Sequence, residues 1–234
     1  MKKYIVTAFV ALFFVNCAEM QQIANQLPQN FPMNQADIAS GLKEALQNGI
    51  DKQVTKLTAT DGFYRNELVK IMLPEELKKV DSRLRSLGLS SLADEGLLMI
   101  NRAAENAVKE ATPIFIDAIK QMSINDAQSI LMGQDNAATS FLQKTTNQSL
   151  YNKFKPIIAS SYQKVGADKV WNSIISKYNT IPLVEKVNPD LTDYTTKKAM
   201  DGVFTMIAIE EKNIRNTVSA RSSELLRKVF AMQD

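Results

Sequence analysis

Residues Leu92–Met132 read LADEGLLMINRAAENAVKEATPIFIDAIKQMSINDAQSILM, and this stretch has the clearest helical period in the chain. Residues that suit a buried stripe recur at steps of three or four positions: Leu97, Asn101, Ala104, Val108, Ala111, Phe115, Ala118 and Met122. Charged residues such as Lys109 and Lys120 fall on the opposite side, as in an amphipathic helix. Because alanine is small, the stripe permits close approach of neighbouring helices. The stretch therefore predicts the centre of an all-α domain.

The composition agrees with a folded helical protein and excludes several classes of site. The 234 residues are 45% hydrophobic and 23% charged, with only 8 Gly and 7 Pro, which favours long helices over a strand-rich fold. Histidine is absent, which excludes Ser-His-Asp and Cys-His nucleophiles, His-ligated zinc and Glu-x-x-His di-iron sites. The formal charge of +3 includes Lys2 and Lys3. Without them the chain is almost neutral, which argues against nucleic acid as a partner.

Residues 1–17, MKKYIVTAFVALFFVNC, are typical of an export signal. Two lysines precede an apolar run from Tyr4 to Val15, which is shorter than the about 20 residues that a spanning helix needs. The run ends at the only cysteine of the chain, Cys17. This arrangement resembles the lipobox of bacterial lipoproteins, in which the cysteine is diacylated and becomes the first residue after cleavage. Phe14 stands where Leu is usual, and Asn16 stands where Gly, Ala or Ser is usual.

The leader predicts an exported protein on the periplasmic side of the envelope, attached to the membrane through a lipidated Cys17. Ala18 follows the cysteine, so the Asp that marks retention in the inner membrane is missing, and this favours the outer membrane. Two alternatives stay open. The signal could be cleaved in the ordinary way near the same place, or it could remain as an uncleaved anchor.

A tether and one helical domain are expected after the leader. Residues 18–33, AEMQQIANQLPQNFPM, are rich in Gln and Asn, contain two prolines and show no strong period. Residues 34–234 are expected to form a single domain of about nine helices. The expected helices cover about 34–57, 74–87, 90–112, 113–122, 123–133, 135–166, 167–178, 190–213 and 219 or 222 onward. Local signals mark three of their starts: Thr112 as a cap before Pro113, the Ser-x-x-Asp pattern of Ser123 and Asp126, and Asp135 or Asn136. Residues 63–73 could be a short helix or an extended, strand-like piece.

Several short motifs resemble one protein family in sequence order. They are GLKEAL (41–46), NRAAE (101–105), PIFIDAI (113–119), MSINDA (122–127), ILMG (130–133), AAT (137–139), AMDGVF (199–204), EE (210–211), IR (214–215) and LLRKVF (225–230). The chain resembles the bacterial family of uncharacterised exported proteins called domain of unknown function 4197. The resemblance implies an export leader and a helical body, and it brings no activity or catalytic residues. Thr195 departs from the Val expected after Tyr194.

Polar residues that could form a site are few. Asn101, Arg102 and Glu105 lie within little more than one helical turn, where Arg102 could bind an anion and Glu105 could position it. The alternative is a buried polar network that fixes helix register, or an exposed Glu105–Lys109 pair.

A second charged group lies near the C-terminus. It contains Glu210, Glu211 and Arg215, and with Glu105, Asp117 and Asp201 it could supply oxygen ligands to a cation. Helices provide no fixed ligand spacing such as that of an EF-hand loop, so neither a metal site nor a cofactor is predicted. No residue is predicted to be catalytic.

Three classes of function follow from these observations. The first is a lipid-anchored, non-enzymatic helical domain that binds or supports another envelope component, such as a protein. The second is a periplasmic carrier or sensor of a small apolar or anionic ligand, held between helices 101–122 and 190–215. An enclosed apolar cavity of several hundred Å³ would support it. The third, an enzyme that works with carboxylates alone, is disfavoured because no motif identifies a catalytic pair.

Overall fold

The computed structural model describes residues 34–73, 78–86, 88, 90–164 and 190–232, with some positions between 166 and 186. In this part of the chain, helices account for all the regular secondary structure. They are α2 (Gln35–Thr58), α3 (Lys78–Ser86), α4 (Ser90–Val108), α5 (Ala111–Gln121), α6 (Ile124–Leu131), α7 (Ala137–Gln163), α9 (Leu191–Asn216), a 3₁₀ turn (Val218–Ala220) and α10 (Glu224–Phe230). The predicted all-α class is confirmed.

Two sequence predictions fall on residues outside this description. They are the leader and tether of residues 1–33, and most of the helix expected at 167–178. The count of about nine helices and the export signal therefore stay predictions. Within the described residues, no helix is both long and apolar enough to cross a bilayer.

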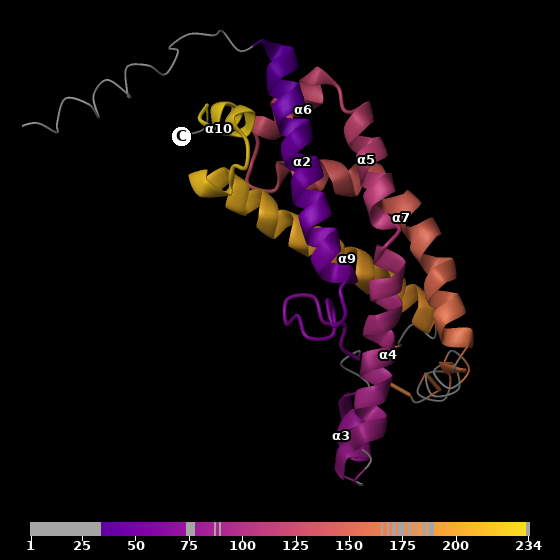
Figure 1. Ribbon diagram of the computed structural model, residues 1–234. Helices are drawn as coiled ribbons and strands as arrows, with labels where there is room; N and C mark the ends of the chain where they lie inside the picture. Colours follow the sequence, from indigo (N-terminus) through magenta and orange to yellow (C-terminus); the bar gives the residue numbers. More distant parts are fainter. Residues whose placement is uncertain are drawn as a thin grey trace, which may run out of the picture. The chain divides into compact units, whose positions relative to one another are not determined.

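The stretch 92–132 forms α4, α5 and α6, and its predicted stripe is largely buried. Ala104, Val108, Ala111 and Phe115 are fully buried, whereas Ala118 is half-buried. The helix breaks at residues 109–110, and α5 then continues in nearly the same direction as α4 (Figure 1). Pro113 lies at the third position of α5, where a helix leaves its N–H groups unpaired and the missing donor costs nothing.

Helix starts that depend on local signals lie close to their predicted positions. Ser123 Oγ accepts a hydrogen bond from Asp126 N at 3.1 Å, and Ser123 N donates to Asp126 Oδ2 at 3.0 Å, which completes the predicted capping box of α6. The residue that caps α10 is Ser223, one position after the predicted Ser222. Thr112 does not cap α5 as predicted, because the helix begins at Ala111 and the capping position is Glu110.

Helix α9 is central to the packing. It contacts α2, α4 and α7, and in Figure 1 its ribbon crosses that of α2. The Phe204 ring on α9 meets the Phe115 ring on α5 edge-on, with centroids 5.9 Å apart. The other long helices pack around this centre, with α7 along α4 and α5, and α10 against α2.

Residues 59–73 form a connection of turns followed by residues without regular secondary structure. Neither a helix nor a strand ladder forms at 63–73 within the described residues, so both predictions for this piece, a short helix and a strand-like segment, are wrong. Phe63, Val69 and Ile71 are nevertheless buried. Gly202 on α9 makes room for this connection, because a Cβ built there would lie 2.7 Å from Phe63 Cε1.

Substitution Gly202→Ala should destabilise the domain by about 1–3 kcal/mol, because the added methyl overpacks the contact between α9 and Phe63. The measurement is urea unfolding followed by circular dichroism. The matched control is Gly96→Ala in α4, where nothing lies within 4 Å of the new Cβ. This control should gain roughly 0.5–1 kcal/mol from helix propensity. Equal effects of the two substitutions would contradict the close packing of Phe63 on Gly202.

Candidate functional site

The eight polar residues singled out in the sequence do not form a single cluster. Asn101, Arg102 and Glu105 on α4 hold the connection 59–73, and we call these three residues the loop clamp. Glu211 and Arg215 on α9 bind the ends of two other helices, and we call this pair the helix-end pair. Glu210 bonds to α2, and Asp117 and Asp201 are exposed on α5 and α9.

The side-chain amide of Asn101 forms hydrogen bonds with both backbone groups of Ile71 in the connection. Its Oδ1 accepts a hydrogen bond from Ile71 N at 2.8 Å, and its Nδ2 donates to Ile71 O at 3.0 Å and to Leu97 O at 2.8 Å. Asn101 is fully buried, so these bonds satisfy groups that water cannot reach. The donor and acceptor groups of Asn101 are therefore engaged in holding residue 71.

Glu105 and Arg102 fix the beginning of the same connection. Glu105 Oε1 accepts from Phe63 N at 3.1 Å, and Glu105 Oε2 accepts from Arg102 Nη1 at 2.7 Å. The other arm of the Arg102 guanidinium donates to Asp61 Oδ1 at 2.7 Å. The hydrogen bond to Glu105 raises the pKa of Arg102 above its ordinary value.

Both arms of Arg102 are thus engaged with carboxylates of the chain itself. This geometry supports the interpretation of the loop clamp as a polar network that fixes structure, rather than as an anion site. Asp61, which has a left-handed backbone with φ of 66°, was not singled out as a partner of Arg102. The Asp61-Gly62 pair predicts a turn, but nothing in the sequence shows which arginine lies near Asp61.

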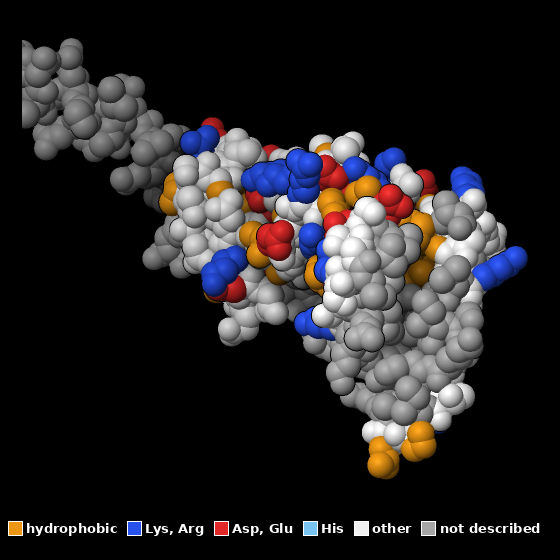
Figure 2. Space-filling model, turned by 90° about the horizontal axis from the view of Figure 1, so that it is seen from below, with side chains coloured by type: hydrophobic (Ala, Val, Ile, Leu, Met, Phe, Trp, Pro, Cys, Tyr) orange, Lys and Arg blue, Asp and Glu red, His pale blue; other side chains and the backbone are white. Residues whose placement is uncertain are grey.

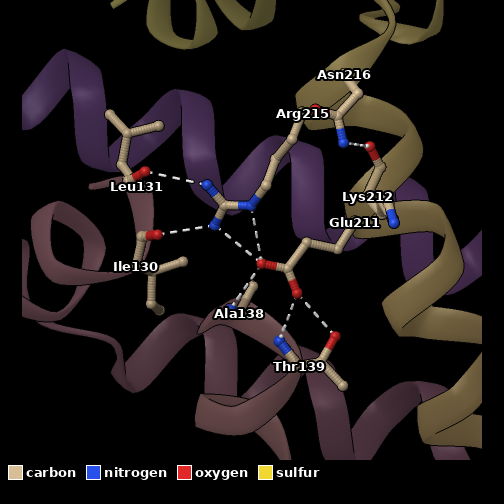
Figure 3. Close-up of polar contacts among 8 residues, drawn as sticks. All are labelled: Ile130, Leu131, Ala138, Thr139, Glu211, Lys212, Arg215 and Asn216. Atoms are coloured by element: carbon tan, nitrogen blue, oxygen red, sulfur yellow. Dashed lines mark hydrogen bonds and ion pairs between the residues drawn. The ribbon is translucent and has the colours of Figure 1, made fainter. Parts of the chain in front are cut away.

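Glu211 binds the first turn of α7 from a distant helix (Figure 3). Its Oε1 accepts from Ala138 N at 2.9 Å, and its Oε2 accepts from Thr139 N and Thr139 Oγ1, both at 2.8 Å. The N-terminal end of a helix carries partial positive charge and unpaired N–H groups, so a carboxylate is favoured there. Asn136, the capping position, makes no capping bond with its own side chain. The carboxylate of Glu211 accepts these N–H groups in place of a local capping side chain.

Arg215 links this carboxylate to the end of α6. Its Nε and Nη2 lie 3.1 and 2.9 Å from Glu211 Oε1, and its Nη1 and Nη2 donate to Leu131 O at 3.0 Å and Ile130 O at 2.8 Å. Figure 3 shows the guanidinium lying between the two carbonyls and the carboxylate. Both side chains are buried. A cation is favoured at a helix C-terminus, so the helix-end pair joins complementary ends of α6 and α7.

Two neighbouring polar groups extend this arrangement. Arg221 donates to Arg215 O at 2.9 Å and Ile214 O at 3.2 Å, which closes the end of α9. Glu210 accepts from Gln53 Nε2 at 2.6 Å and pairs with Lys52 Nζ at 2.5 Å, which ties α9 to α2. Adjacent glutamates therefore bind different helices.

The carboxylates of both groups are occupied by hydrogen bonds within the fold. The carboxylates of Glu105, Glu210 and Glu211 each accept hydrogen bonds from side chains or amides of the fold. Among the described residues, no group of three acidic, Cys or His side chains is placed to hold a metal ion. The chemistry of both groups is that of structural hydrogen bonding.

A model of the family described as "Protein of unknown function (DUF4197)" matches residues 32–231. The chain belongs to this family. No curated protein and no solved structure gives a match.

Two features of this DUF4197 chain bear on the earlier expectations. Thr195, the departure from the expected pattern, is fully buried, and its Oγ1 lies 2.7 Å from the hydroxyl of Tyr162 on α7. The pocket between α2, α9 and α10 has a volume of about 20 Å³, room for roughly one water molecule. No residue of 101–122 lines this pocket, so it is not the cavity predicted between helices 101–122 and 190–215, and the carrier stays a prediction.

Substitution Glu211→Ala should cost about 3–5 kcal/mol of unfolding free energy, because it leaves the buried Arg215 charge and the α7 amides without their partner. Urea unfolding monitored by circular dichroism measures the change. The matched control is Glu224→Ala, which removes an exposed ion pair with Lys228 on α10 and should leave stability unchanged. A loss for Glu211→Ala no larger than that of the control would refute the role of the helix-end pair.

Substitution Asn101→Ala should destabilise the domain by about 3 kcal/mol, since the N–H and C=O of Ile71 then stay buried without partners. It should also speed cleavage within residues 59–73 in limited proteolysis under native conditions. Asn106→Ala, on the exposed side of α4, is the control and should behave as wild type. Unchanged cleavage in Asn101→Ala would show that the connection is held by other contacts.

Proposed function

We propose that the chain is an exported cell-envelope lipoprotein whose helical domain binds or supports another envelope component without catalysing a reaction. The observation that carries the proposal is the leader MKKYIVTAFVALFFVNC, which combines two lysines, a short apolar run and a single cysteine at its end. The alternatives of ordinary cleavage and of an uncleaved anchor are outcomes of the test below.

The tether is suited to an anchored domain. Residues 18–33 separate Cys17 from the start of α2, and a tether of this length, as their composition predicts, would span roughly 22 Å on average. A domain on such a tether works close to the membrane that holds it. Because Ala18 rather than Asp follows the cysteine, we place the anchor in the outer membrane of a cell that has one.

The polar residues support a binding or structural role over catalysis. Those on α4 and α9 that looked most like a site are bonded to backbone groups and to each other. Such groups are held in place by the fold and have little freedom to exchange protons with a substrate. The partner is then expected to contact the outer surface. On the face seen in Figure 2, basic and acidic side chains are interspersed around small hydrophobic areas.

The test is the intact mass of the native protein extracted from membranes, compared with a Cys17→Ala variant. Wild type should have the mass of residues 17–234 plus a diacylglyceryl group, and the variant should lack that group. Asn16→Gly, which restores a usual lipobox residue, is the control and should keep the modification. An unmodified, freely soluble periplasmic form would contradict the anchor and would favour ordinary cleavage and a diffusible carrier. A membrane-bound form with the mass of residues 1–234 would show an uncleaved anchor instead.

A further inference from the structure

A groove of about 470 Å³ lies between α5 and α7, outside both groups of polar residues described above. The two helices run side by side (Figure 1), and Asp126 in the first turn of α6 also lines the groove. Its volume falls in the range of sites that bind small molecules or single side chains. We call it the α5–α7 groove.

Four of the six polar residues that line the α5–α7 groove offer hydrogen-bond acceptors, and the other two, Gln121 and Ser149, can both donate and accept. Thr145 Oγ1 donates to Phe141 O at 2.9 Å, and Thr146 Oγ1 donates to Leu142 O at 2.6 Å, so both hydroxyl protons are used within α7. Their lone pairs remain for a ligand. A ligand that brings its own donors matches this lining better than one that brings acceptors.

The charge of the lining is negative. Asp117 and Asp126 both line the groove, and neither Lys nor Arg does. Asp117 is exposed on α5 and makes no hydrogen bond or ion pair within the described part of the chain. Asp126 Oδ2 accepts hydrogen bonds from the side chain and the backbone N–H of Ser123. These bonds lower the pKa of Asp126, so the carboxylate stays ionised. Lys144, which is not part of the lining, also lowers the pKa of Asp126 through its charge.

The remaining lining is apolar and includes one aromatic ring. Ile114, Ala118 and Phe141 are each half-buried. Methylene groups of a ligand can lie against such side chains, and a cation is attracted to the face of an aromatic ring. Carboxylates, spare acceptors and a partly exposed ring together are the chemistry that recognises organic cations.

We propose that the α5–α7 groove binds an organic ammonium group, with Asp117 as the principal counter-charge and Phe141 beside the alkyl chain. The ammonium group could belong to a free amine or to a lysine side chain of an envelope partner, since both present the same atoms. The proposal goes beyond the envelope function above and does not depend on whether Cys17 is lipidated.

The test is calorimetric titration of the full chain, purified in non-ionic detergent, with 1,5-diaminopentane and with a pentalysine peptide. Wild type should bind at least one probe saturably. Asp117→Asn should weaken binding by about threefold, as expected for one partly exposed charge pair. Asp201→Asn, an exposed aspartate on α9 outside the groove, is the control and should bind as wild type.

A second pair of variants tests the position of the site. Gln121→Lys places a positive charge in the groove and should weaken binding by about tenfold, whereas Gln143→Lys, exposed on α7 outside the lining, should not. Equal affinity for both probes would identify a free amine as the ligand class, and much tighter binding of the peptide would identify a partner's lysine. Absence of saturable binding, or equal effects of paired variants, would overturn the proposal.

Discussion

The buried carboxylate of Glu211 is the interaction on which the packing around α9 depends. It satisfies two first-turn amides of α7 and neutralises Arg215, whose other N–H groups satisfy the last carbonyls of α6. Each of these groups is buried, and each would be costly alone, since a buried charge without its partner destabilises a fold by several kcal/mol. The end of α6 and the start of α7 are therefore fixed to α9 by two side chains.

This constraint changes how the polar residues of the chain are interpreted. Arg102 and Glu211 have the residue types of a binding site, yet each is bonded to groups of the same domain. These bonds tie the helices to one another, and on our proposal a partner therefore binds the outer surface. The exposed Asp117 differs from them, because it carries charge into a groove without a partner in the described part of the chain.

The parts of the fold that the sequence predicted are those with local causes. The capping box of α6 needs only Ser123 and Asp126, and the buried stripe of α4 follows from helical period alone. The start of α7 was expected from Asp135 or Asn136, but its capping group is Glu211, which lies 73 positions from Ala138. No pattern within one helix reveals such a partner.

The partners of the candidate site residues likewise could not be predicted from patterns within one helix. Glu210 and Glu211 were grouped because they are neighbours in the sequence, but consecutive residues of a helix point about 100° apart. The first consequently meets Gln53 on α2, whereas the second meets α7. Asp61 could not be predicted as the partner of Arg102 for the opposite reason, because 41 positions separate the two residues in the sequence. Residue types indicated where charge would be buried, and only the fold shows what each charge binds.

Native-state hydrogen exchange of the Ala138 and Thr139 amides tests the central claim most directly. If Glu211 holds the start of α7, both amides should be protected as strongly as that of Leu150 in the middle of the same helix. The internal reference is the amide of Thr112, at the equivalent position of α5, where the capping residue Glu110 makes no side-chain bond. Exchange of Ala138 and Thr139 as fast as that of Thr112 would contradict the account.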